Sequence, residues 1–326
     1  MPLELEHRGS SRSLPPEGVV IGLLNNMPDS ALEATEQQFA VLLRAAAGPR
    51  TVRLRLSSLP ELERGAAARA RIDSQYWPLE ELLEEPPDAL IVTGTEPRTA
   101  ALEEEPYWDR LVRLIAWAET HTASSIWSCL AAHAVAHSLH GVRRRRLAAK
   151  RFGVYEHRIR AGGPLLQGVR APLLTPHSRW NELAVAELER AGFDVLSASE
   201  ETGADLFVRA DRSLFVCFQG HPEYESLTLL KEYRRDVGRY LRGEHADWPT
   251  APHGYFTPQS LERLAAFRAQ VGATRDPALL AEFPMAELAA HIQVDWRPGA
   301  VRIYQNWLAF VAAAKERTPR KHLLPV

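Results

Sequence analysis

Two reactive side chains follow predicted buried strands, where open parallel sheets bind their ligands. Cys129 comes directly after a predicted strand at 124–127 and opens a predicted helix. His221 follows a second predicted strand, which ends at Phe218, and Glu223 comes two residues later. Ligands of open α/β sheets bind outside the carboxyl ends of the strands, and a helix N-terminus favours the thiolate form of a cysteine. The three residues supply a nucleophile, a base and an orienting carboxylate, which predicts cysteine-based covalent catalysis.

Cys129 also admits two other interpretations. A free cysteine often acts as an inert buried hydrophobe, and we interpret Cys217, within an apolar run, in that way. Cys129, His133 and His137 recur every four residues, as in zinc-binding helices. Two helical turns separate the first and third residues by about 12 Å, too far for one ion. We therefore expect no metal site here.

The basic residues are unevenly distributed. Arginines 143–146 are consecutive, and they form either a solvated loop or a partner for the phosphates of an anionic cosubstrate, since guanidinium groups pair well with phosphate. Only four of the 39 basic residues are lysines. One of them, at position 150, comes just before a motif at 153–157. It is either a surface residue without a specific role or a residue chosen because the site needs a compact ammonium group.

The elements that must position these residues alternate between strand and helix. Strands are expected at 19–24, 52–56, 89–92, 124–127, 154–159, 194–198, 206–209 and 214–218, and helices at 31–47, 107–119, 130–139, 181–190 and 226–241. Most of the strands are continuous apolar runs, typical of parallel sheets covered on both faces, whereas 52–56 alternates as a half-exposed strand does. Ser30 and Glu33 have the spacing of a capping box. The alternation predicts an α/β fold with a doubly wound, mainly parallel sheet.

The 326-residue chain is expected to have three parts. Residues 1–18 are polar and predict a mobile leader, and residues 19–256 form the α/β domain. Residues 257–326 predict a helical C-terminal extension packed on the same domain, with a Pro/Arg-rich tail after residue 318.

Composition excludes several classes of protein. The net charge of −2 argues against a nucleic-acid partner. Two cysteines cannot form a disulfide framework. No segment reaches the ~18 apolar residues of a membrane span or resembles a secretory signal. We therefore expect a cytoplasmic protein in a reducing compartment, with no membrane partner.

A series of short motifs follows a fixed order along the chain. They are Asn-Met-Pro at 26–28, Leu-Ile-Val-Thr-Gly at 90–94, Cys129, Gly-Val-Tyr-Glu-His at 153–157, Pro-His-Ser-Arg at 176–179 and Gly-His-Pro-Glu-Tyr at 220–224. In this order and spacing they resemble the homoserine O-succinyltransferase family of methionine biosynthesis. The likeness covers roughly residues 19–256 and returns at 306–308. It implies a class I glutamine amidotransferase-like fold.

The resemblance implies ping-pong acyl transfer from an acyl-CoA cosubstrate to homoserine, without a bound cofactor. Cys129 would become a thioester. His221 would first take the thiol proton and then act as base on the acceptor hydroxyl, oriented by Glu223. The implied oxyanion hole uses the backbone N–H groups of Leu130 and of a residue near Thr95.

The resemblance also assigns substrate contacts. Lys150, Ser178 and Arg235 fall at the homoserine-binding positions. Arg235 suits a carboxylate, and Glu232 or Ser178 suits an ammonium group. The position that tunes acyl specificity, glycine with succinyl and glutamate with acetyl, is Arg98 here. Because an arginine can pair with the distal carboxylate of succinyl, we expect succinyl-CoA rather than acetyl-CoA.

The implied partners are small molecules, acyl-CoA and homoserine, and a homodimer is compatible with the resemblance. The chain departs from the family pattern in a shorter leader, a short insertion between Pro28 and Phe39, and an added helical stretch at 258–290.

Three competing hypotheses remain. One is a class I amidotransferase-like cysteine hydrolase acting on glutamine or another amide, although Ser128, Leu130 and Ala131 stand where such enzymes usually have glycines. Another is a non-catalytic sensor on the same scaffold, which the intact Cys129, His221 and Glu223 disfavour. The third is acyl transfer to serine, since one methylene is worth only ~1–3 kcal/mol in a pocket.

Overall fold

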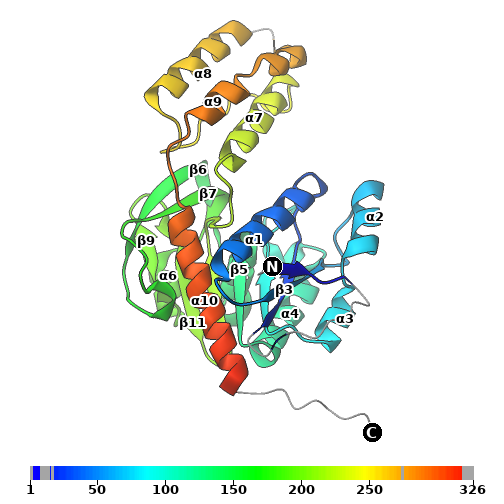
Figure 1. Ribbon diagram of the computed structural model, residues 1–326. Helices are drawn as coiled ribbons and strands as arrows, with labels where there is room; N and C mark the ends of the chain where they lie inside the picture. The colour runs from blue at the N-terminus through cyan, green and yellow to red at the C-terminus, as the bar shows by residue number, and fades with distance from the viewer. Residues whose placement is uncertain (1–2, 8–14, 16–17, 273–274, 318–326) are drawn as a thin grey trace.

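An eight-stranded sheet forms the centre of the computed structural model, which describes residues 3–7, 15, 18–272 and 275–317 (Figure 1). In spatial order its strands are β1 (Leu3–Leu5), β3 (Val52–Ser57), β2 (Val19–Leu24), β4 (Ala89–Val92), β5 (Ser124–Ser128), β12 (Leu214–Phe218), β11 (Leu206–Ala210) and β8 (Asp194–Val195). The first six strands in this order, β1 to β12, are parallel to one another. The last two strands pair antiparallel, β11 with β12 and β8 with β11. The predicted α/β fold with a mainly parallel sheet is confirmed.

Alternating side chains of the central strands enter two apolar cores, one on each face of the sheet. In β4, Ala89 and Ile91 contact one core, and Leu90 and Val92 contact the other. Helices α1 (Leu32–Ala46) and α10 (Arg297–Arg317) cover the first face. Helices α3 (Leu79–Glu84), α4 (Trp108–His121) and α5 (Leu130–His140) cover the second. Burial on both faces explains why these strands read as continuous apolar runs.

A second, antiparallel sheet has the order β10-β9-β6-β7. Its strands are β10 (Gly203–Ala204), β9 (Ser197–Ser199), β6 (Arg145–Ile159) and β7 (Leu173–Glu182). We expected a strand only at 154–159 and an irregular chain before it, and we did not predict β7. The first half of β6 is largely exposed and its register with β7 shifts between Arg146 and Arg151, so it carries no apolar alternation.

The second sheet also changes two other predictions. The expected strand at 194–198 is divided between β8 in the main sheet and β9 in the second sheet. The helix expected from residue 181 begins later, as α6 (Val185–Arg190), because residues 181 and 182 belong to β7.

The N-terminal region corrects three predictions. Leu3–Leu5 form a parallel edge strand where we expected a mobile leader, and the rest of 1–18 lies largely outside the described residues. β3 is mostly buried rather than half-exposed, because β1 covers its edge and Glu6 lies 2.6 Å from Arg55 Nε. The capping box does not form: Ser30 lies in a 3-10 turn, and α1 begins at Leu32 without a side-chain cap.

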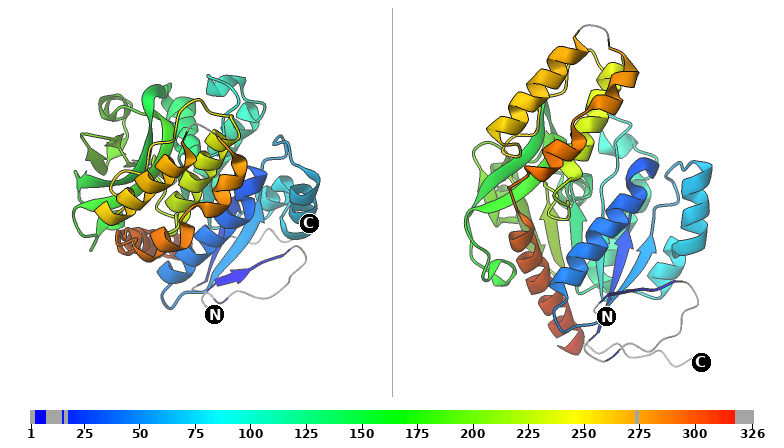
Figure 2. Two further views of the ribbon diagram at one scale, coloured as in Figure 1. Left: turned by 90° about the horizontal axis from the view of Figure 1, so that it is seen from above. Right: turned by 45° about the horizontal axis from the view of Figure 1, so that its top comes forward.

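Helices α8 (Pro258–Val271), η4 (Pro277–Glu282) and α9 (Met285–Ala290) gather on α7 (Thr228–Leu241) around a third apolar cluster. Figures 1 and 2 show this group at one end of the molecule, while α10 returns along the sheet beside α1. On α10, Trp307 Nε1 donates to Ser124 Oγ at 2.9 Å. The division into 19–256 and 257–326 stays a prediction, and the tail after 318 lies outside the described residues.

One further helix, α2 (Ala66–Gln75), was not predicted, and neither was α3. None of the helices in the described part of the chain combines the length and apolar character that a membrane crossing requires.

Candidate active site

Cys129 forms a tight elbow between β5 and α5. Its φ of 53° and ψ of −113° are strained for a residue with a side chain. The Cys129 N–H donates to Phe218 O at 2.8 Å, which ties the elbow to the end of β12. This strand-to-helix turn holds the thiol at the carboxyl edge of the sheet, as we expected.

His221 and Glu223 follow β12 on the neighbouring strand end. His221 Nδ1 lies 2.8 Å from Glu223 Oε1, and both side chains are buried. Glu223 Oε1 also accepts a hydrogen bond from Ser128 Oγ at 3.4 Å. Because Glu223 takes Nδ1, the other ring nitrogen of His221, Nε2, is left for Cys129 on the adjacent strand end. The structure thus brings the three predicted catalytic residues together.

The charges of the site favour a protonated His221. Burial by itself would lower the pKa of His221, but the charge of Glu223 and the hydrogen bond and charge of Cys129 outweigh it and raise this pKa well above its usual value. A protonated imidazole beside Cys129 stabilises a thiolate, which is the nucleophilic form of cysteine. The site therefore places a protonated imidazole beside the sulfur of Cys129.

The predicted oxyanion hole lies where the turn after β4 meets the start of α5. A Cβ on Gly94 would lie 3.0 Å from Leu130 N. Leu130 is the first residue of α5, where backbone N–H groups have no acceptor within the helix. The Gly94–Thr95 turn therefore lies against an N–H group next to the nucleophile, as an oxyanion hole requires.

The residues predicted to bind homoserine gather around one carboxylate. Glu232 Oε2 accepts from Ser178 Oγ at 2.6 Å and lies 3.8 Å from Lys150 Nζ and 3.9 Å from Arg235 Nη2. Glu232 lies on α7, Ser178 on β7 and Lys150 on β6, so the cluster depends on the unpredicted hairpin. Arg235 is 46% exposed, and its guanidinium is accessible to a ligand.

Tyr224 connects this cluster with the catalytic base. Its hydroxyl donates to Glu232 Oε1 at 2.6 Å, and its ring stacks on His221 with centroids 4.4 Å apart. Asp236 also belongs to the cluster, 3.2 Å from Lys150 Nζ and 3.0 Å from Arg235 Nη2. We had not predicted Tyr224 or Asp236, although Glu232 and Asp236 have the i, i+4 spacing of one helix face.

Arg98 lies at the rim of a cavity of about 560 Å³. Its guanidinium is 54% exposed and lies 3.0 Å from Glu63 Oε2, and its N–H donates to Glu105 Oε1 at 2.7 Å. Thr95 and Tyr107 line the same cavity. The predicted specificity residue is therefore paired with the exposed carboxylate of Glu63 and remains half exposed at the cavity.

The arginine run is divided between a loop and a strand: Arg143 and Arg144 lie in the connection before β6, and Arg145 and Arg146 begin that strand. All but Arg144 are exposed, as expected of a solvated segment. Arg143 Nη2 lies 2.8 Å from Glu103 Oε1, Arg144 Nη2 donates to Ala100 O at 3.0 Å, and the Arg146 guanidinium lies 4.6 Å from the Trp180 ring centre.

The other reactive side chains have partners of their own. His133 Nε2 lies 3.1 Å from Gln219 Oε1, and His137 Nε2 lies 2.9 Å from Glu103 Oε1, so the two histidines point to different partners. Cys217 is fully buried, and burial raises the pKa of its thiol, which confirms its interpretation as a core residue.

A cysteine at a strand-to-helix elbow, with a carboxylate-oriented histidine on the adjacent strand end, is the arrangement expected of a cysteine enzyme. The chain has a class I glutamine amidotransferase-like fold. The fold is similar to a glutamine amido transferase from Methylobacillus flagellatus, with a TM-score of 0.51 and 16% identity over 91% of this chain and 96% of that one.

The family is shown by sequence. The model of the homoserine O-succinyltransferase family matches residues 11–318. The chain is 45% identical to a homoserine O-succinyltransferase of Rhodopseudomonas palustris, over 94% of this chain and 92% of the relative. It is 42% identical to one of Bradyrhizobium japonicum, over 93% of each chain. The chain belongs to the homoserine O-succinyltransferase family.

Proposed function

We propose that this protein is an enzyme of methionine biosynthesis that transfers a succinyl group from succinyl-CoA to the hydroxyl of L-homoserine, through a thioester on Cys129. The observation that carries this proposal is the contact of Tyr224 with both His221 and Glu232, which joins a cysteine–histidine pair to a cluster of charges fit for an amino acid. Family membership supports the same reaction.

In the first half-reaction the Cys129 thiolate attacks the carbonyl carbon of the acyl-CoA. The new Sγ–C bond forms, the C–S bond to CoA breaks, and the departing CoA sulfur takes the proton from His221 Nε2. The carbonyl oxygen becomes negative on the way, and the Leu130 N–H beside the Gly94–Thr95 turn stabilises it. A neutral His221 remains beside the thioester.

In the second half-reaction His221 Nε2 takes the proton of the acceptor hydroxyl. The acceptor oxygen attacks the thioester carbon, the Sγ–C bond breaks, and Cys129 returns to the thiolate. Glu223 stays ionised throughout, holds the imidazole orientation and stabilises its protonated form. The two half-reactions together restore the thiolate–imidazolium pair.

The acceptor is bound through both of its charged ends. The exposed guanidinium of Arg235 offers a two-pronged hydrogen bond to the carboxylate. Glu232, with Ser178 beside it, accepts from the ammonium group. Lys150 and Asp236 form an ion pair beside Glu232 and Arg235, so positive and negative charges in the pocket offset one another.

The donor is bound on the other side of Cys129, along the cavity that Thr95 and Arg98 line. Arg98 pairs with the distal carboxylate of the succinyl group in exchange for Glu63. We place the reaction in the cytoplasm, where the reducing environment keeps free thiols such as Cys129 and Cys217 from oxidation. A homodimer is compatible with this proposal.

The experiment is a matrix of succinyl-CoA and acetyl-CoA against homoserine and serine, with glutamine hydrolysis as a separate assay. We expect the highest kcat/KM with succinyl-CoA and homoserine. A preference for serine would contradict homoserine as the acceptor, and a preference for acetyl-CoA would contradict succinyl-CoA as the donor. Release of ammonia from glutamine without acyl transfer would contradict the proposed reaction.

A further inference from the structure

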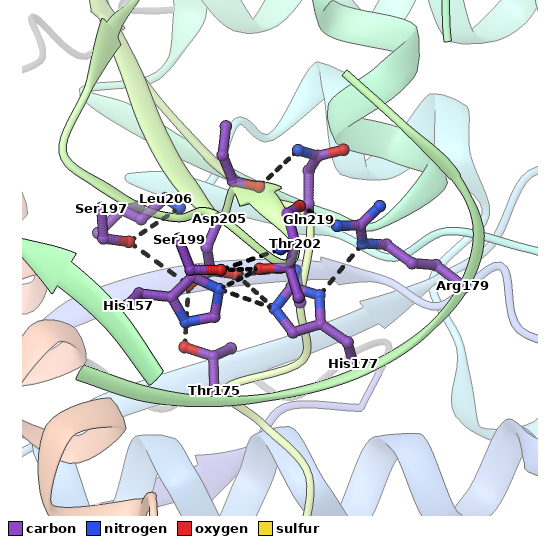
Figure 3. A network of polar contacts seen from close by, with 12 residues as sticks. His157, Thr175, His177, Arg179, Ser197, Ser199, Thr202, Asp205, Leu206 and Gln219 are labelled. Carbon is purple, nitrogen blue, oxygen red and sulfur yellow. Dashed lines mark hydrogen bonds and ion pairs between the residues drawn. The ribbon is translucent and has the colours of Figure 1, made fainter. Parts of the chain in front are cut away.

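Figure 3 shows a network of buried polar side chains. The network contacts the backbone next to His221 through Gly220 N. Its central members are His157 on β6, Thr175 and His177 on β7, and Asp205 between β10 and β11. All four are at most 2% exposed. The proposed mechanism uses none of them, and a buried polar group is costly unless hydrogen bonds compensate it.

The hydrogen bonds fix the proton on His177. Arg179 Nε, which always carries hydrogen, donates to His177 Nδ1 at 3.1 Å. Burial, followed by the charge of Arg179, lowers the pKa of His177 well below its usual value. His177 is therefore neutral, with its proton on Nε2, which lies 3.3 Å from His157 Nε2 and 3.5 Å from Asp205 Oδ1.

This protonation state opposes metal binding. Ligand atoms of His157, His177 and Asp205 lie within 4.8 Å of one another, close enough to surround one ion. A metal would need the lone pair of His177 Nε2, the atom that carries the proton, and the cation of Arg179 lies on the other side of the ring. The cluster is arranged for hydrogen bonding instead.

Asp205 connects the network to the catalytic loop. Its Oδ1 accepts from Gly220 N at 3.1 Å, and its Oδ2 accepts from Thr175 Oγ1 at 2.9 Å. The backbone reinforces both contacts, since Gln219 N donates to Asp205 O and His221 N donates to Pro176 O, each at 2.8 Å. Residues 219–221 are thus held between Asp205 and β7.

The contact is too close for any side chain at position 220. A Cβ on Gly220 would lie 2.5 Å from Thr175 Cγ2 and 2.8 Å from Asp205 Oδ1. β7 also carries Ser178, whose partner Glu232 belongs to the proposed acceptor site. The network therefore joins the strand of the acceptor site to the loop of the catalytic base.

We propose that Asp205 is a positioning residue for acyl transfer: by holding the Gly220 amide and the Thr175 hydroxyl, it keeps His221 between Cys129 and Glu223. This inference rests on the proposed function for its kinetic consequence, but the position of His221 can be tested without any acyl-CoA. The Asp205 carboxylate acts through Gly220 and does not contact the reacting atoms itself.

The test measures how fast iodoacetamide alkylates Cys129 as a function of pH. Cys217 is fully buried and does not compete. The variants are Asp205→Ala, Asp205→Asn and Thr175→Val, and the matched control is Thr202→Val. Thr202 is equally buried in the network, but its hydroxyl contacts His157 and Ser199 rather than Asp205. Folding is verified by circular dichroism and by the thermal midpoint.

We expect alkylation of Asp205→Ala and Thr175→Val to need a higher pH than alkylation of the parent, because a displaced His221 supports the thiolate less well. Asp205→Asn keeps an acceptor for Gly220 N–H and should restore most of the parent profile. Thr202→Val should keep the parent profile even where its thermal midpoint falls. Equal shifts in Thr175→Val and Thr202→Val, or no shift in a folded Asp205→Ala or Thr175→Val, would overturn the inference.

The kinetic part uses acyl transfer. In Asp205→Ala, kcat should fall about 10- to 100-fold with smaller changes in both KM values, because a misplacement of about 1 Å can cost about 100-fold. If Asp205→Ala does not fold, Thr175→Val decides the question by the same comparison. A parent without acyl transfer contradicts the proposed function, whereas the alkylation profiles still test the position of His221.

Discussion

Glu223 Oε1 lies 2.8 Å from His221 Nδ1, and only Pro222 separates the two residues in the chain. The base and its orienting carboxylate therefore lie on one short turn after β12, and Cys129 is tied to the end of the same strand through Phe218 O. This turn fixes which imidazole nitrogen faces the thiol. Because His221 lies on this turn, the position of the turn relative to Cys129 determines how well the imidazole can stabilise the thiolate.

The first prediction concerns this pair and the pH dependence that it produces. His221→Ala should lose about 10²- to 10⁴-fold in both half-reactions, as expected for removal of a general base. Glu223→Gln should lose less.

The same pair predicts a pH dependence. Because the charge of Glu223 raises the pKa of His221, removing that charge lowers this pKa, and the imidazole loses its proton at lower pH. The alkaline fall in the rate of enzyme acylation by the donor should then move to lower pH in Glu223→Gln, measured by stopped-flow release of CoA. An unchanged alkaline limb would contradict the assignment of Glu223.

The second prediction concerns the acceptor carboxylate. Arg235→Lys keeps the charge but loses the two-pronged geometry, so the KM for homoserine should rise strongly with little change in acylation by the donor. Arg239→Lys is the matched control, since Arg239 lies on the same helix and also contacts Asp236, at 3.9 Å. Initial rates at varied homoserine measure both variants. A normal KM in Arg235→Lys would show that the carboxylate binds elsewhere.

The third prediction concerns the acyl donor. Arg98→Ala should reduce the preference for succinyl-CoA over acetyl-CoA by about 10- to 100-fold, since a hydrogen bond to a charged group is worth about 1.5–3 kcal/mol. Glu63→Gln should act in the opposite direction, because it frees the guanidinium that Glu63 holds at 3.0 Å. The ratio of kcat/KM for the two donors measures both effects. If neither variant changes this ratio, Arg98 does not contact the acyl group.

The fourth prediction concerns the oxyanion hole. Gly94→Ala places a methyl group 3.0 Å from Leu130 N, and kcat should fall about 10²- to 10³-fold, the usual cost of losing one donor to the oxyanion. Gly162→Ala is the control, because a Cβ there meets no atom within 4 Å. Near-parent kcat in a folded Gly94→Ala would remove this turn from the mechanism.

The sequence predicts the central sheet because its strands are buried on both faces. β2, β4 and β12 are nearly continuous apolar runs, and such a run can be recognised whatever its pairing register. β5 is less clear, because serines surround Ile126 and Trp127. The first half of β6 and helix α2 escape prediction because they bury little: Ala68 is the one buried residue of α2. Without an apolar face, neither element has a readable period.

The catalytic residues could be found because each follows a recognisable strand. Asp205 and Thr175 could not, since they are single polar residues in segments 30 positions apart. Their contact arises from the pairing of β6 with β7 and of β11 with β12, whose registers are not apparent in the sequence. Arg53 shows the same limit: it looks exposed, but the distant Glu4 and Glu6 pair with it.

The fifth prediction is the thioester itself, which is the central claim. The measurement is the intact mass of the protein after mixing with succinyl-CoA in the absence of an acceptor, in the parent and in Cys129→Ser and Cys129→Ala. Cys129→Ser should remain folded and inactive, because an alcohol is a far weaker nucleophile near neutral pH than a thiolate.

We expect the parent to gain the mass of one succinyl group, to lose it when homoserine is added, and to yield succinylhomoserine in equal amount. Neither variant should gain mass. Acylation that persists in Cys129→Ala, or a parent that forms product in normal yield without ever carrying the acyl group, would contradict the account.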